Sequence, residues 1–137
     1  MIRVMVVDDH DFVRSTMCEL IDSTDDMRVV GAAENGAEAL PTARASDPEV
    51  VLMDLSMPVM NGIDATRELV AAVPGIRVIV LTTSTRGQDV HDAAAAGAIG
   101  FIGKGAEPDE VLEAVRSAGQ GGTAWDRRSA EILRHMG

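Results

Sequence analysis

The stretch "VVLMDLSMPVMNG", residues 50–62, joins a continuous apolar run to one carboxylate and a turn-forming loop. Its first four residues are apolar without alternation, which is typical of a strand buried on both faces of a parallel sheet. Such a strand usually ends in Gly, Asn or Ser, which satisfy free backbone groups without placing a charge beside apolar side chains. Because Asp54 ends this one, we expect its carboxylate to have a charged partner.

Similar apolar runs recur along the chain and alternate with segments of helical period. The runs cover residues 3–7, 28–32, 50–53, 77–81 and 98–102, and the helical segments cover residues 12–21, 36–46, 61–72, 86–96 and 107–119. This alternation predicts an α/β fold, a doubly wound five-stranded parallel sheet of flavodoxin-like order 2-1-3-4-5 with helices on both faces. Pro41 should kink or shorten the second helix, because proline removes one backbone hydrogen bond.

Composition restricts the location and the partners of the chain. The 12 basic and 22 acidic residues give a formal net charge of −10, so the chain should be repelled by phosphate backbones and should not bind DNA directly. The only cysteine, Cys18, has no partner, which favours a reducing compartment and a place in the core. The sequence shows no signal peptide or membrane span, and we expect a soluble cytoplasmic protein without membrane contact.

The last segment, residues 120–137, differs in character from residues 1–119, which we expect to form one domain. It begins with a glycine-rich linker and continues with apolar residues at helical spacing, namely Trp125, Ile132, Leu133 and Met136. This pattern predicts a linker and an amphipathic helix leading toward a further domain outside this sequence. It also places Trp125 away from the functional site.

Acidic residues follow the first and third predicted strands. In a doubly wound sheet these two strands flank the switch point where ligands bind, so Asp8, Asp9 and Asp54 should converge there. Three carboxylates in one crevice need a cation, and an all-oxygen site suits Mg2+. Thr82 and Lys104 end the fourth and fifth strands at the same edge. A hydroxyl, an ammonium and a divalent ion around one carboxylate suit a small phosphoryl group, and a carboxylate can itself be the nucleophile.

With these residues in place, the sequence resembles the response-regulator receiver domains of two-component systems, over residues 2–119. The matching features are the acid pair, Asp54 within "DLSMPVMNG", Thr82, and Phe101 three residues before Lys104. The motif "VVDDHDFVR" and the "GG" linker are most similar to the NarL/FixJ class, whose members carry a LuxR-type helix-turn-helix output domain.

The resemblance implies that Asp54 accepts a phosphoryl group from a sensor histidine kinase and that the chain catalyses only its own phosphorylation and dephosphorylation. It implies Mg2+ ligation by Asp9, Asp54 and the backbone carbonyl of Ser56, with Asp8 acting through water. Thr82 and Lys104 would bind phosphoryl oxygens. Phe101 would be the switch aromatic that changes the face of the fourth helix, fifth strand and fifth helix, and so controls transcription. It also implies a homodimer on phosphorylation.

The sequence departs from this family at two positions. Gly105 follows Lys104 where many receivers have proline, and a cis bond at this glycine would cost roughly 3 kcal/mol. The switch position holds phenylalanine instead of the commoner tyrosine, so no phenolic hydroxyl can report its state through a hydrogen bond.

Other interpretations stay open for parts of the pattern. Alone, Asp8 and Asp9 would suit a turn and a helix cap, and His10 is expected to be an exposed loop residue. A flavodoxin-like electron carrier would not place "DDHD" against a phosphate, and an aspartyl phosphatase would need a second acid where Ser56 stands. The serious alternative is a receiver-like interaction module that signals without phosphate, or a stand-alone receiver.

Overall fold

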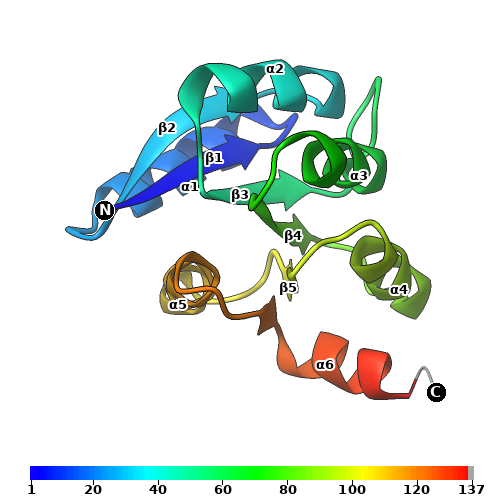
Figure 1. Ribbon diagram of the computed structural model, residues 1–137. Helices are drawn as coiled ribbons and strands as arrows, with labels where there is room; N and C mark the ends of the chain where they lie inside the picture. Colours follow the sequence, from blue (N-terminus) through cyan, green and yellow to red (C-terminus); the bar gives the residue numbers. More distant parts are fainter. Residues whose placement is uncertain (136–137) are drawn as a thin grey trace.

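The apolar runs of the sequence form the strands of one parallel sheet in the computed structural model, which describes residues 1–135 (Figure 1). The strands are β1 (Ile2–Val7), β2 (Met27–Ala33), β3 (Val50–Asp54), β4 (Arg77–Thr82), β5 (Gly100–Gly103) and β6 (Ala124–Trp125). Their order is β2-β1-β3-β4-β5-β6, and every pair is parallel. The doubly wound α/β prediction and the order of its first five strands are therefore confirmed.

Helices cover both faces of this sheet. They are α1 (Asp11–Asp22), α2 (Gly36–Ser46), α3 (Gly62–Ala72), α4 (Gly87–Ala95), α5 (Pro108–Gly119) and α6 (Arg127–Arg134). One core cluster contains Ile21 of α1 and Val115 of α5, whereas a second contains Ala43 of α2 and Leu69 of α3. Helices α1 and α5 therefore lie on one face and α2 and α3 on the other, as the ribbon shows (Figure 1).

Side chains of the central strands alternate between these two clusters. Val50 and Leu52 of β3 face the cluster of α1 and α5, while Val51 and Met53 face the cluster of α2 and α3. All residues of β3 are buried, which is the pattern expected for a central strand of a parallel sheet. This two-sided burial fixes the register of β3 and therefore the position of Asp54 at its end.

Helix α2 begins where the sequence predicts and continues past Pro41. Asn35 caps it, accepting a hydrogen bond at 3.0 Å from the backbone N–H of Glu38. Of the two predicted effects of Pro41, the shortening does not occur, because the helix continues to Ser46, and the kink stays a prediction. Ala39 and Ala43, on either side of Pro41, are buried against the second core cluster and stabilise the helix across the missing hydrogen bond.

The tail is part of the sheet, which corrects the prediction of a simple linker before a helix. Gly100 pairs with Ala124 and Phe101 with Trp125, so β6 adds to the outer edge of β5. A Cβ atom at position 100 would lie 2.7 Å from the carbonyl oxygen of Ala124, and glycine is therefore needed for this approach. Trp125 lies in a strand and not in the predicted helix, whereas Ile132 and Leu133 do lie in α6. Met136 is outside the described residues.

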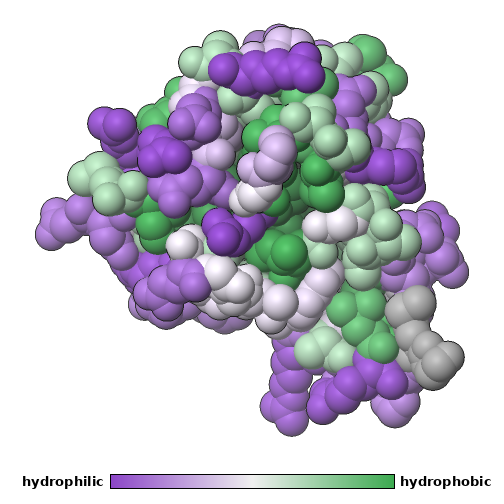
Figure 2. Space-filling view, viewed as in Figure 1, coloured by the Kyte–Doolittle hydropathy of each residue, from purple (hydrophilic) through white to green (hydrophobic). Residues whose placement is uncertain are grey.

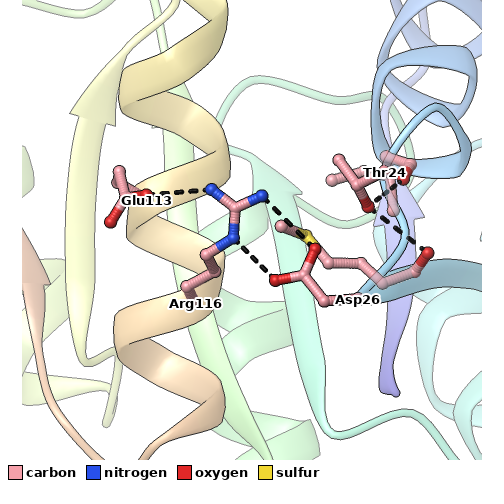
Figure 3. Close-up of polar contacts among 6 residues, drawn as sticks. Thr24, Asp26, Glu113 and Arg116 are labelled. Carbon is pink, nitrogen blue, oxygen red and sulfur yellow. Dashed lines mark hydrogen bonds and ion pairs between the residues drawn. The ribbon is translucent and has the colours of Figure 1, made fainter.

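An ion-pair network ties α5 to the turn before β2 (Figure 3). The Nε atom of Arg116 lies 2.7 Å from Oδ2 of Asp26, and its Nη1 atom lies 2.9 Å from Oε1 of Glu113. The hydrogen bond from Arg116 lowers the pKa of the Asp26 carboxyl. This network joins two segments of the same sheet face that are 90 positions apart in the sequence.

Two composition-based predictions concern Cys18 and the membrane. Cys18 is half-buried and packs against the first core cluster, and burial raises the pKa of its thiol. Within residues 1–135, no helix has the length and apolar character required to span a bilayer.

We predict that Gly62→Ala destabilises the fold through the junction of β3 and α3. A Cβ atom at position 62 would overlap the backbone carbonyl oxygen of Asp54, so the helix start or the strand end must shift. Such overpacking costs about 1–3 kcal/mol, which thermal unfolding would detect as a lower melting temperature. The matched control is Gly105→Ala, whose added Cβ meets open space. Equal melting temperatures for the two variants would contradict this prediction.

Candidate functional site

Three carboxylates meet at the carboxyl ends of β1 and β3. Asp8 and Asp9 follow β1 directly and Asp54 is the last residue of β3, and one oxygen of each lies within 4.8 Å of the others. Asp8 and Asp54 are only 3% and 6% exposed, whereas Asp9 is exposed. The adjacency of β1 and β3 brings these residues together, because Val7 pairs with Met53 in the register of the sheet.

Lys104 supplies the positive charge expected for Asp54. Its Nζ atom lies 3.0 Å from Oδ2 of Asp8 and 3.2 Å from Oδ1 of Asp54. The backbone N–H of Lys104 donates to the carbonyl of Thr82 at 2.8 Å, which fixes the lysine against the end of β4. The described residues contain no cis peptide bond, so the Lys104–Gly105 bond is trans.

One ammonium does not neutralise this cluster, and the consequence is a shift in pKa. Burial, with the nearby charge of Asp8, raises the pKa of Asp54 from 3.8 to about 6, although Lys104 acts in the opposite direction. Burial alone would lower the pKa of Lys104, but its contacts with Asp8 and Asp54 outweigh burial and raise it. The ionised cluster therefore has excess negative charge and favours an additional cation.

The acid pair also organises the start of α1. The Oδ1 atom of Asp8 accepts a hydrogen bond at 2.9 Å from the backbone N–H of His10. His10 is exposed and is the N-cap residue of α1, but its side chain makes no capping hydrogen bond. Asp8 therefore stabilises this turn and also contacts Lys104. Asp9 contributes its carboxylate to the acidic cluster.

The loop between Asp54 and α3 is a tight turn with an unusual residue at its tip. Val59 has φ of 70°, and the backbone N–H of Met60 donates to the carbonyl of Pro58 across it at 2.7 Å. β-branched residues rarely adopt a positive φ, and the three-residue turn centred on Val59 is a strained type of turn. The turn brings the chain back so that the N–H of Gly62 reaches the carbonyl of Leu55 at 2.8 Å. Ser56 lies in this loop, exposed and two residues from Asp54.

Thr82 and Phe101 lie on the side of the site that faces the tail. Thr82 is buried at the end of β4, and its Oγ1 accepts a hydrogen bond at 3.0 Å from the backbone N–H of Ser84. Phe101 is 2% exposed and packs in a third core cluster with Val80 and Val90. Trp125 belongs to the same cluster, so the expectation that Trp125 lies away from the site is wrong.

A pocket of ≈ 340 Å³ lies beside these residues, and two of the residues that line it were not identified from the sequence. Thr82, Phe101 and Lys104 line this pocket together with Asp126 and Arg128 of the tail. The sequence signal for these two residues was the short "DRR" motif, but only the pairing of β6 with β5 brings it to the site.

The assembled groups suit an anion that is bound next to a metal ion. A carboxylate at the end of a buried strand is the candidate nucleophile, and the lysine and the threonine hydroxyl are candidate donors to oxygens of the anion. The three acids present the oxygen ligands that hard divalent cations prefer.

Known proteins are similar to this chain over most of its length. The family model of the response regulator receiver domain matches residues 4–116. The response regulator GacA of Pseudomonas protegens is 43% identical over 116 residues, which are 85% of this chain and 54% of GacA. The response regulator UvrY of Escherichia coli is 39% identical over 121 residues, which are 88% of this chain and 56% of UvrY. The chain therefore spans about half the length of the curated relatives it matches.

A solved structure extends the similarity into the tail. The crystal structure of a two-component response regulator of the LuxR family from Aurantimonas sp. SI85-9A1 superposes with a TM-score of 0.90 at 31% identity. The match covers 96% of this chain and 94% of that one.

We predict that metal-free stability decreases with rising pH because of Asp54. Since its pKa in the folded protein is about 6, above the ordinary 3.8, the folded state binds more protons than the unfolded state between these values. Acidification from about pH 7 to about pH 5 should therefore stabilise the fold through this group by on the order of 1 kcal/mol. Urea unfolding in chelator would measure this contribution as the difference between wild type and Asp54→Asn, which should lack it. A parallel pH dependence of the two proteins would contradict the prediction.

We also predict that Asp9→Asn raises stability in chelator and weakens stabilisation by Mg2+. Lys104 contacts Asp8 and Asp54, so removing the Asp9 charge relieves repulsion without breaking an ion pair among residues 1–135. The gain should be at most about 1 kcal/mol, and the added stability from Mg2+ should shrink because one ligand is lost. Thermal unfolding with and without Mg2+ tests both effects, and the exposed Asp25→Asn is the charge-matched control. A lower melting temperature in chelator, or an undiminished Mg2+ effect, would rule out Asp9 as a ligand.

Proposed function

We propose that this chain, which belongs to the response regulator receiver domain family, takes a phosphoryl group onto Asp54 from the phosphohistidine of a sensor kinase. The observation that carries the proposal is the contact of Asp54 with Lys104 at 3.2 Å, inside a cluster of carboxylates at the end of a buried strand. A carboxylate oxygen attacks phosphorus, the phosphorus–nitrogen bond breaks, and the released imidazole takes up a proton. The product is an aspartyl phosphate.

The residues around Asp54 have separate proposed roles. The ammonium of Lys104 compensates the charge on the transferred phosphoryl oxygens, and the hydroxyl of Thr82 donates a hydrogen bond to one of them. Asp54 is ionised above its pKa of about 6, which is the form that attacks. Because these groups are held by the ends of β4 and β5, the chain supplies the positioning and the charge compensation for its own phosphorylation. The same groups would serve its own dephosphorylation.

The donor set fits Mg2+. The carboxylates of Asp8, Asp9 and Asp54 lie within 4.8 Å of one another, and one lysine leaves their charge incompletely balanced. We propose that Asp9, Asp54 and the backbone carbonyl of Ser56 ligate the ion directly, with Asp8 acting through water. When bound, Mg2+ supplies positive charge for the phosphoryl oxygens.

The proposed output is a change in the face formed by α4, β5 and α5. Thr82 moves toward the phosphoryl group and Phe101 fills the space beside it, which is a two-state change that phosphate biases. Residues 1–119 act as the phosphoacceptor, and residues 120–137 connect it to a C-terminal helix-turn-helix output domain that regulates transcription. This proposal rests on the LuxR-family relative and on the longer curated relatives, of which this chain spans about half. Phosphorylation would also promote a homodimer.

Location and DNA contact follow from composition. The single free cysteine suits a reducing compartment, and we propose a cytoplasmic location. With a formal net charge of −10, this chain should leave DNA recognition to the output domain. A receiver-like module that signals without phosphate is not favoured, because it would not need three acids and a lysine at one sheet edge.

We predict that acetyl phosphate with Mg2+ adds one phosphoryl group to the wild type and none to Asp54→Asn. Intact-protein mass spectrometry measures the addition, and alkaline treatment should remove it because acyl phosphates hydrolyse in base. Asp25→Asn, an exposed aspartate outside the cluster, should label like wild type. Undiminished labelling of Asp54→Asn would place the nucleophile at another residue.

A further inference from the structure

The tail reaches the phosphoryl site through contacts that the proposed transfer does not use. The backbone N–H of Asp126 donates to the carbonyl of Phe101 at 3.0 Å, and the guanidinium of Arg128 donates to the carbonyl of Thr85. Asp126 and Arg128 also line the pocket, together with Thr82 and Lys104. We call residues 124–134, which contain β6 and α6, the docked tail.

The carbonyl of Thr85 that Arg128 contacts belongs to the loop between Thr82, at the end of β4, and the start of α4. Thr83, Thr85 and Arg86 of this loop are exposed, so little apolar packing holds it. Its position depends on hydrogen bonds, among them Ser84 N–H to Thr82 Oγ1 and the Ser84 hydroxyl to the carboxylate of Asp89. Arg128 adds an anchor from outside the loop, three residues beyond Thr82.

The docked tail also packs on the switch aromatic. Trp125 pairs with Phe101 in the sheet, and Ile132 and Leu133 join the same core cluster. Side-chain carbons of Ile132 lie 3.8 Å from the point where a Cβ atom would stand on Gly87, at the start of α4. Helix α6 therefore packs against α4. Figure 2 shows apolar surface continuing from the α4 region into α6 at the lower right.

Two features weaken this docking. The hydroxyl of Ser129 is buried in the docked tail, with the residue only 1% exposed, and it has no hydrogen-bond partner among residues 1–135. A buried hydroxyl without a partner disfavours the docked state relative to one exposed to water. The strand that anchors the tail is only two residues long. A modest interaction at the phosphoryl site can therefore shift the tail between docked and released states.

We propose that Arg128 is a positioning residue for phosphoryl binding: by anchoring Thr85 it holds the loop between β4 and α4 in the arrangement from which Thr82 moves toward the phosphoryl group, so tail docking and phosphoryl occupancy strengthen each other. This inference rests on the proposed function, since it concerns the same site. The coupling is reciprocal, because a tail that favours the bound group must itself be stabilised by that group. Phosphorylation would then tighten the connection between the receiver and the output domain.

The test measures binding of beryllofluoride, a stable mimic of a bound phosphoryl group, to the chain with Mg2+ by calorimetry. Arg128→Ala should weaken binding by about fivefold, the effect of one hydrogen bond, and Arg128→Lys should restore part of the loss. Ser129→Ala removes the unpartnered hydroxyl and should tighten binding. The matched control is Arg127→Ala, which loses the same charge from the same helix at a side chain that is 95% exposed. Its affinity should equal that of wild type.

A second readout separates positioning from general stability. Hydrogen exchange of the backbone amides in residues 124–134 should slow when beryllofluoride binds the wild type, and this slowing should be lost in Arg128→Ala. Equal affinities for Arg128→Ala and Arg127→Ala, or unchanged exchange in the tail, would overturn the inference. If wild type itself does not bind beryllofluoride, or if Asp54→Asn binds it equally well, the proposed function fails instead.

Discussion

The crowding of three carboxylates around one lysine is the interaction on which the rest of this molecule depends. Asp8 and Asp54 lie side by side because β1 and β3 are neighbours, and they stay nearly buried because helices cover both faces of these strands. Burial and the charge of Asp8 raise the pKa of the Asp54 carboxyl, which shows how strongly these neighbouring charges act on one another. The same acids cost stability, and the apolar clusters on both sides of the sheet must offset that cost.

The sequence predicted the parts of the structure that follow from local chemistry and from the geometry of parallel sheets. The run ending at Asp54 is apolar without a break, which is the usual pattern of a short strand buried on both faces of a parallel sheet. Once strands 1 and 3 are neighbours, the residues that follow them must meet, which is why Asp8 and Asp54 could be paired without a structure. Lys104 was placed beside them by the same reasoning.

The tail could not be predicted in this way, because its structure depends on partners distant in sequence. Ala124 and Trp125 form a strand only because Gly100 leaves room for them at the edge of β5. Arg128 reaches Thr85 across 43 positions, and no periodic pattern signals such a contact. Pro41 failed as a signal for a similar reason, since the buried alanines on either side hold the helix together. Tertiary packing overrides the local preference in each case.

The two residues of β6 also cover part of the outer edge of β5. Without them, the outer backbone groups of β5 would face solvent and could pair with a strand of another molecule, which is how soluble proteins begin to aggregate. If occupancy of the site tightens the tail, the unoccupied protein is the form that exposes this edge more often. The exposure is limited because β5 spans only Gly100–Gly103 and both its ends are glycine, a residue that forms weak strands. Because β5 is short, release of the tail would expose only a short strand edge to pairing with another molecule.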